Sequence, residues 1–175
     1  EGKIRTIRLA REKKIPYLGL CFGMQMAVIE FAQNVLGLKD ANSTEVNPKT
    51  PHPIIHIMPE QEKYLKKHQY GGTIRLGQWP CKIKEKTILS KVYGKKTVFE
   101  RHRHRYEVNG DYRRRLEERG MVISGVSPDN QLVEAVELNQ KLHPFFVGTQ
   151  FHPEYQSRPL SPHPLFVDFL KAAMR

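Results

Sequence analysis

Residues 17–37 have the sequence YLGLCFGMQMAVIEFAQNVLG. Residues 17–20 form a short apolar run of strand length. Residues 22–36 are apolar on nearly every side, which predicts a buried helix that ends at Gly37. An amphipathic helix is expected just upstream, over residues 3–14, and Pro16 should end it. The order helix, buried strand, buried helix predicts an α/β fold with a mostly parallel central sheet flanked by helices.

The rest of the chain indicates further strands and helices separated by turn residues. Short strands are expected at 54–58 and around 74–76, 81–83 and 97–108. A helix is expected over 113–120, three strand-like runs (VISGV, QLVEAVEL and FFVGTQF) follow it, and a helix over 164–174 closes the chain. Residues 60–72 are polar, end in two glycines and are expected to form a mobile surface loop. Because no repeat or linker interrupts this pattern, residues 1–175 are expected to form one domain.

Composition excludes several classes of protein. The 175 residues include only two cysteines, Cys21 and Cys81, in no metal or redox spacing. This argues against a disulfide scaffold and favours a reducing, cytoplasmic compartment. No run of about 18 apolar residues predicts a membrane span, and no signal-peptide pattern is present. The chain begins with Glu1-Gly2 rather than Met, so we expect it to be cut from something longer.

The segment Gly19-Leu20-Cys21-Phe22-Gly23 places a potential nucleophile between an expected strand and an expected helix. This is the cysteine counterpart of the G-x-S-x-G nucleophile elbow. Glycines are expected at both flanking positions because side chains would clash on the sharp turn. The helix N-terminus favours the thiolate, and the N–H of Phe22 is available to an oxyanion. The alternative is that Cys21 is a small buried hydrophobic residue at a strand end.

A cysteine nucleophile needs a base, and Phe151-His152-Pro153-Glu154 follows an apolar strand late in the chain. A histidine at a strand end can meet the elbow through the fold. Glu154 can accept from the other ring nitrogen and fix the tautomer of His152. The alternative is that His152-Pro153 is only a loop that ends the strand.

GLCFGMQ together with the late FHPE resembles the class I glutamine amidotransferases. The resemblance implies a flavodoxin-like architecture and a triad that hydrolyses glutamine to glutamate and ammonia. Five further segments resemble the glutaminase domain of the CTP synthase family in particular: ANSTEV (41–46), GGTIRLG (71–77), ERHRHRYEVN (100–109), QLVEAVE (131–137) and HPLFVDFL (163–170).

The resemblance implies a role for each candidate residue. Cys21 would be the nucleophile, His152 the base and Glu154 the carboxylate that orients it. The glutamine substrate would be bound by Phe22, Gln25, Glu45 and Arg105. A carboxylate at Glu45 suits the substrate ammonium, and a guanidinium at Arg105 can grip the substrate carboxylate with two hydrogen bonds. Each of these residues has an alternative interpretation as a surface or capping residue.

The resemblance also implies partners and cofactors. The domain itself would need no cofactor or metal. In the family, ammonia serves the ATP-dependent amination of UTP to CTP in an amidoligase (synthetase) domain that uses ATP and Mg²⁺, in a homotetramer activated allosterically by GTP. The 60–72 region corresponds to a lid tied to that activation, although no GTP contact can be assigned to a residue there.

The same resemblance implies that the domain is N-terminally incomplete. In the family, the first strands and a glycine-rich loop that supplies the second oxyanion donor precede the segment matching EGKI. Removing one oxyanion donor costs on the order of 10²–10³ in kcat. The chain alone is therefore expected to be a weak glutaminase and, with a sheet edge exposed, prone to aggregate.

Other functions remain open on the residues alone. The net charge of +11 and the run RHRHR suggest a nucleic-acid-binding module, since alternate arginines on a strand would face one side, but no nucleic-acid fold motif is present. A metal site could use Cys21, Cys81 or the eight histidines, although Pro53 breaks any helix that would pair His52 with His56. A sister γ-glutamyl hydrolase would share the elbow, and a catalytically dead fragment is the remaining alternative.

Overall fold

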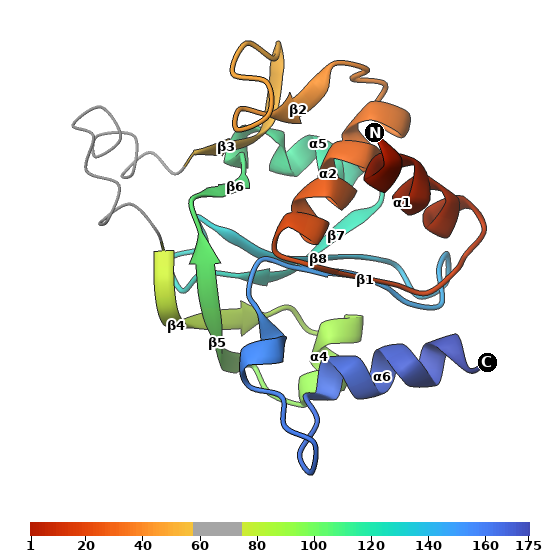
Figure 1. The fold of residues 1–175 in the computed structure, drawn as a ribbon, viewed down its shortest axis with the longest axis vertical. Coiled ribbons are helices and arrows are strands. Elements are labelled where there is room, and N and C mark those ends of the chain that lie inside the picture. Colours follow the sequence, from red (N-terminus) through yellow and green to blue (C-terminus); the bar gives the residue numbers. More distant parts are fainter. Residues whose placement is uncertain (58–74) are drawn as a thin grey trace.

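The structure, a computed structural model, describes residues 1–57 and 75–175 and contains two β-sheets (Figure 1). The main sheet has six strands, in the spatial order β1 (Tyr17–Leu20), β9 (Phe146–Thr149), β8 (Val133–Leu138), β7 (Met121–Val126), β4 (Arg75–Ile83) and β5 (Thr97–His104). The smaller sheet has the order β2 (Ala41–Ser43), β3 (His52–Ile57) and β6 (Tyr106–Val108). The surface loop expected over residues 60–72 lies outside the described residues.

Helices cover both faces of the main sheet (Figure 1). On one side lie α1 (Gly2–Glu12), α2 (Phe22–Asn34) and α5 (Arg113–Glu118), and on the other lie α4 (Ile88–Tyr93) and α6 (Pro164–Ala173). The helix–strand–helix order at the start of the chain is therefore confirmed. Within 1–57 and 75–175, no helix is long and apolar enough to cross a membrane.

The sequence did not predict α4 or β2. The helix α4 has six residues and begins with a capping box, in which Thr87 and Ser90 exchange side-chain-to-backbone hydrogen bonds. The strand β2 has three residues. Both are too short for hydrophobic periodicity to distinguish them from a loop.

The expected α/β class is confirmed, but the expectation of a mostly parallel sheet is wrong. In the main sheet only β1 and β9 pair in parallel, and the other four pairings are antiparallel. A parallel pair needs a crossover connection of about a dozen residues or more. The short connections from β7 to β8 and from β8 to β9 can only turn the chain back, so the pairs that they join are antiparallel.

Two hydrophobic cores lie on opposite faces of the main sheet. One packs α1, α2 and α5 against the sheet and includes Met24, Ile29 and Phe146. The other lies under α4 and α6 and includes Leu89, Val147 and Leu165. Phe146 and Val147 are neighbours on β9 and enter different cores because successive strand side chains point to opposite faces. The central strands β8 and β9 are thus buried on both sides, which holds the carboxyl end of β9 in place beside β1.

Candidate active site

Cys21 lies on a strained turn between β1 and α2. Its backbone has φ +47° and ψ −102°, in the left-handed region that non-glycine residues rarely adopt. The turn is held by the Cys21 N–H, which donates to the carbonyl oxygen of Thr149 on β9 at 2.6 Å. The strain and its anchor agree with the nucleophile elbow that the sequence predicts.

Of the two glycines that flank Cys21, only one has neighbouring atoms so close that a side chain would not fit. A Cβ on Gly19 would lie 2.5 Å from the hydroxyl of Tyr17 and 2.8 Å from the backbone of Gly23. A Cβ on Gly23 would meet only the Tyr17 hydroxyl, at an ordinary 3.6 Å. The expectation that both glycines avoid a clash is therefore confirmed for Gly19 and wrong for Gly23.

Burial dominates the electrostatics of the Cys21 thiol and raises its pKa. The backbone N–H of Phe22 and the side chain of Gln150 act in the opposite direction, and the carboxylates of Glu154 and Glu45 add to the rise. The sequence suggested that the helix N-terminus would favour thiolate, but desolvation outweighs the favourable contacts in the resting site. The thiol therefore needs a base to remove its proton.

His152 has the geometry of such a base. Its Nδ1 lies 2.6 Å from Oε1 of Glu154, and its ring stacks on Tyr155 with centroids 5.2 Å apart. Glu154 accepts a hydrogen bond from Nδ1–H of His152, which leaves Nε2 without a proton as the basic nitrogen. That Nε2 is buried and has no hydrogen-bond partner among the described residues. Since Leu20 pairs with Thr149 in parallel register, Cys21 and His152 emerge at the same edge of the sheet.

A cavity of about 260 Å³ opens beside Cys21. It is lined by all four residues expected to bind glutamine, Phe22, Gln25, Glu45 and Arg105, and by Cys21 itself. Glu45 comes from the turn after β2, Gln25 from the first turns of α2, and Arg105 from the junction of β5 and β6. Three separate elements thus bring a carboxylate, an amide and a guanidinium to one thiol.

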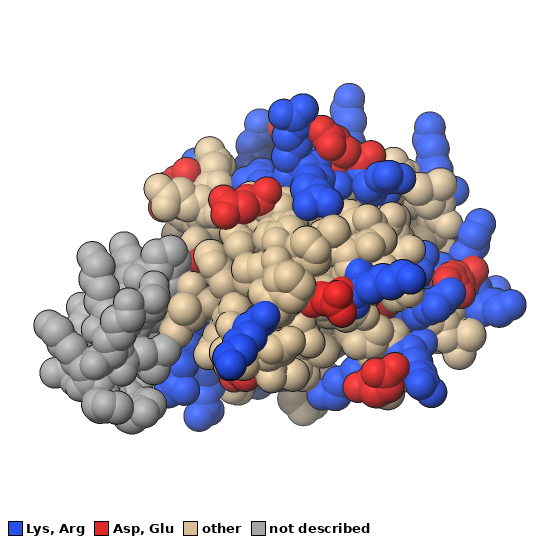
Figure 2. Space-filling model, turned by 90° about the horizontal axis from the view of Figure 1, so that it is seen from above, with Lys and Arg blue, Asp and Glu red and all other residues tan. Residues whose placement is uncertain are grey.

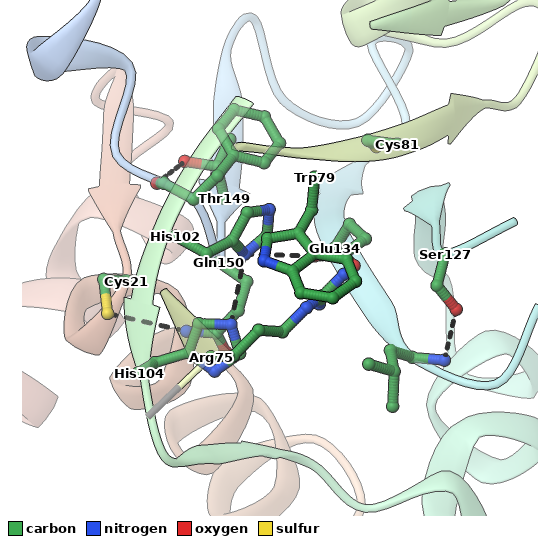
Figure 3. Close-up of polar contacts among 12 residues, drawn as sticks. Cys21, Arg75, Trp79, Cys81, His102, His104, Ser127, Glu134, Thr149 and Gln150 are labelled. Carbon is green, nitrogen blue, oxygen red and sulfur yellow. Dashed lines mark hydrogen bonds and ion pairs between the residues drawn. The ribbon is translucent and has the colours of Figure 1, made fainter. Parts of the chain in front are cut away.

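Arg103, His104 and Tyr106 also line this cavity, and the sequence did not mark them as site residues. Their position within two residues of Arg105, in or directly after the RHRHR segment, is the only signal that could have found them. Gln150 was missed as well, although it stands two residues before His152. Its side chain reaches the sulfur of Cys21 at 3.5 Å (Figure 3).

The RHRHR segment alternates as its strand position predicts. On β5 the side chains of Arg101 and Arg103 are exposed, while His102 and His104 are buried. Arg105 follows the end of the strand and is half-buried. Both histidine side chains are therefore buried, and His104 also lines the cavity together with Arg105.

The positive charge does not form one continuous stripe on the face that carries α1. Figure 2 shows Lys and Arg spread over this face, with Asp and Glu among them. Several charged side chains of the protein pair along helices, as Arg8 does with Glu12 and Arg114 with Glu118. Within residues 1–57 and 75–175, no group of three His, Cys, Asp or Glu side chains could hold a metal ion. Among the described residues, the cavity at Cys21 is therefore the best-supported candidate for a functional site.

A family model for glutamine amidotransferase class-I matches residues 1–172. The chain therefore belongs to the glutamine amidotransferase class-I family. Among its relatives it is 63% identical over 174 residues to the CTP synthase of Caldanaerobacter subterraneus and 55% identical over 175 residues to that of Halalkalibacterium halodurans. These alignments cover 99% and 100% of this chain but only 32% of each relative. The chain thus spans about a third of the length of these CTP synthases.

Solved structures agree with this assignment. The glutaminase domain of Trypanosoma brucei CTPS with bound acivicin is similar with a TM-score of 0.90 and 40% identity, covering 99% of this chain and 65% of that one. A glutamine amidotransferase from Thermotoga maritima is similar with a TM-score of 0.53 at 16% identity, over 87% of this chain and 46% of that one. The second likeness supports the fold alone.

Proposed function

We propose that this chain hydrolyses glutamine to glutamate and ammonia, with Cys21 as nucleophile, His152 as base and Glu154 as the orienting carboxylate. The observation that carries the proposal is the shared cavity. Cys21, Phe22, Gln25, Glu45 and Arg105 line it, and the His152–Glu154 pair stands at the same edge of the sheet. An amide substrate with an ammonium and a carboxylate at its far end matches this set of groups.

The substrate is held at both of its charged ends. Arg105 pairs with the α-carboxylate and Glu45 accepts from the α-ammonium, so that the side-chain amide reaches Cys21. Burial raises the pKa of the Cys21 thiol, so the attack begins with transfer of the thiol proton to Nε2 of His152. The sulfur then adds to the amide carbon, and the resulting oxyanion accepts a hydrogen bond from the backbone N–H of Phe22.

His152 acts as an acid in the first half-reaction and as a base in the second. The imidazolium first gives its proton to the leaving nitrogen, ammonia departs, and a γ-glutamyl thioester remains on Cys21. His152 then takes a proton from water, which attacks the thioester carbon. When the thioester bond breaks, glutamate leaves and the thiol regains its proton. Glu154 stabilises the imidazolium in both steps through Nδ1.

For the whole protein we propose CTP synthase activity, after which its relatives are named. The ammonia would pass to an amidoligase domain that aminates UTP to CTP with ATP and Mg²⁺, in a homotetramer activated by GTP. The support is the 55–63% identity to CTP synthases over the whole of this chain. No residue of this chain is assigned to ATP, Mg²⁺ or GTP.

The test of the glutaminase proposal is release of ammonia and glutamate from glutamine, with Cys21→Ala and Cys81→Ala as a matched pair. We expect turnover in the unmodified chain and in Cys81→Ala, and none above background in Cys21→Ala. Release of ammonia above background that is equal in the unmodified chain and in Cys21→Ala would show that this cysteine is not the nucleophile.

A further inference from the structure

A pair of buried glutamines lies next to the Cys21 thiol. Gln150 follows β9 and is fully buried, and Gln25 on α2 is 3% exposed. The Nε2 of Gln150 lies 3.5 Å from Sγ of Cys21, and the Nε2 of Gln25 lies 3.3 Å from Oε1 of Gln150. The backbone of Gln150 is also fixed, since its N–H donates to the carbonyl of Glu134 at 2.8 Å.

The partners of Gln25 determine which way both amides point. A side-chain amide has a donor end and an acceptor end. The Nε2 of Gln25 lies 2.8 Å from the carbonyl oxygen of Tyr106, which can only accept, so this end of Gln25 must be the donor. Its second N–H then faces Gln150, which must present its oxygen there. The NH₂ group of Gln150 is therefore left to face the sulfur.

Two buried histidines on β5 support the same direction (Figure 3). The Nδ1 of His104 lies 3.1 Å from the Tyr106 carbonyl, and the Nε2 of His104 lies 3.1 Å from Nδ1 of His102. Burial, with Arg75 nearby, lowers the pKa of His102 to about 2 and that of His104 to about 3, so both rings are neutral. Since Nδ1 of His104 must donate to the carbonyl, its Nε2 accepts from His102. The Tyr106 carbonyl thus receives two donors and is a fixed acceptor for Gln25.

We infer that Gln150 is a positioning residue of the glutaminase site, which donates an N–H to Cys21 Sγ and favours its anionic form, and that Gln25 holds the Gln150 amide in that orientation. This inference rests on the proposed function and deepens it. The NH₂ group of Gln150 can donate to the sulfur both before and after the thiol loses its proton. The thiolate gains more from the donor than the thiol does, because hydrogen bonds to charged groups are the stronger ones.

The test measures the thiol directly and needs no glutamine. The rate of alkylation of Cys21 by iodoacetamide is followed against pH, with peptide mapping to assign the modified cysteine. Gln150→Met keeps the approximate length and removes the donor, and Gln25→Met leaves the donor but frees its orientation. Gln33→Met is the control, because Gln33 also lies on α2 and donates to a backbone carbonyl, that of Ala41 at 2.8 Å. Thermal unfolding of each variant checks the fold.

Loss of one hydrogen bond to a charged group should raise the midpoint of the Gln150→Met profile by about one pH unit, which is roughly tenfold slower alkylation at neutral pH. The rates should converge at alkaline pH, where the thiol is ionised in every variant. Gln25→Met should shift in the same direction by a smaller amount, and Gln33→Met should match the unmodified chain. The substitutions leave unchanged the ionisable groups around the thiol, which are Glu45, Arg103, His104, Arg105, Tyr106, His152 and Glu154.

Superimposable profiles for Gln150→Met and the unmodified chain would overturn the inference. If Gln150→Met does not fold, Gln150→Glu replaces it: a carboxylate beside the sulfur should raise the midpoint further, and an unchanged profile there would overturn the inference equally. The outcome is separate from the glutaminase proposal. Shifted profiles together with ammonia release above background that is equal in Cys21→Ala and the unmodified chain would refute the function alone. Unshifted profiles together with ammonia release that depends on Cys21 would refute the role of Gln150 alone.

Discussion

The two thiols of this chain occupy opposite environments. Cys21 lines the cavity and is partly exposed, whereas Cys81 on β4 is fully buried in the core under α4 and α6. Burial raises the pKa of Cys81 far above that of a free thiol, although Arg75 and the backbone of Val126 act in the opposite direction. Its exposure to the cavity therefore makes Cys21, and not Cys81, the thiol expected to react.

We expect the glutamine-like electrophile 6-diazo-5-oxo-norleucine to modify Cys21 and to leave Cys81 untouched. Peptide mapping by mass spectrometry identifies the modified residue, and Cys81→Ala should take up label at the same rate as the unmodified chain. A label on Cys81 in the folded protein would contradict the assignment of the nucleophile.

Arg105 should contribute to substrate binding through the shape of its guanidinium as well as its charge. Arg105→Lys keeps the charge but removes the planar fork that binds a carboxylate with two hydrogen bonds. We expect KM for glutamine to rise about tenfold, the cost of roughly 1.4 kcal/mol of binding, with a smaller change in kcat. Arg101→Lys is the matched control on the same segment, since Arg101 does not line the cavity at Cys21. A KM equal to that of the control would argue against this role.

At the scale of the element, β1 and α2 act as one unit. Tyr17 at the start of β1 donates its hydroxyl to the carbonyl of Gly23 in the first turn of α2, at 2.9 Å, and the backbone of Gly19 passes close to both. This contact sets the angle between strand and helix, and so it sets where Cys21 points. The predicted strand and helix are confirmed, but their mutual packing depends on the ring of Tyr17.

Gly19→Ala should destabilise this unit, because its Cβ would lie 2.5 Å from the Tyr17 hydroxyl. We expect a loss of about 1–3 kcal/mol in the free energy of unfolding, as is usual for overpacking a tight contact. Gly23→Ala should be neutral or slightly stabilising, because its Cβ has room and alanine favours a helix. Urea unfolding of the two variants measures the difference, and equal stabilities would show that the close approach at Gly19 relaxes without cost.

At the scale of the molecule, the interior holds histidines that cannot easily take a proton. Burial lowers the pKa of His102 to about 2 and of His104 to about 3, against about 6.5 in an unfolded chain. Between about pH 3 and pH 6.5 the unfolded state therefore binds more protons, so these groups lower the free energy of unfolding as the pH falls. Glu134 acts the other way, since burial raises its pKa to about 7 against the opposing effect of Arg75.

We therefore expect His102→Gln to flatten the loss of stability on acidification. Between about pH 6 and pH 4, its free energy of unfolding should fall less steeply than that of the unmodified chain, by up to about 1.4 kcal/mol per pH unit, the value for one proton. Urea unfolding at several pH values gives both slopes. Parallel slopes would show that His102 takes up its proton as easily in the folded state as in the unfolded one.

The sequence by itself determined the features that depend on neighbours along the chain. Apolar periodicity predicted β1 and α2, and the glycine at position 19 marked a turn too tight for a side chain. The two-residue period of a strand placed His102 and Arg103 on opposite faces, and the structure shows that the histidine is the buried one. The resemblance located the cavity residues, and the structure brings Gln25, Glu45 and Arg105 together around Cys21. The triad roles remain predictions to be tested by the experiments above.

Only the tertiary structure decided the features that depend on residues far apart in the sequence. It placed β9 between β1 and β8 and made most of the sheet antiparallel, because strand direction follows from which strands pair and not from their composition. It brought Gln150 to the sulfur of a residue 129 positions away. It also buried the thiol enough to outweigh the helix N-terminus, since desolvation depends on every group packed around the sulfur and no local pattern records that sum.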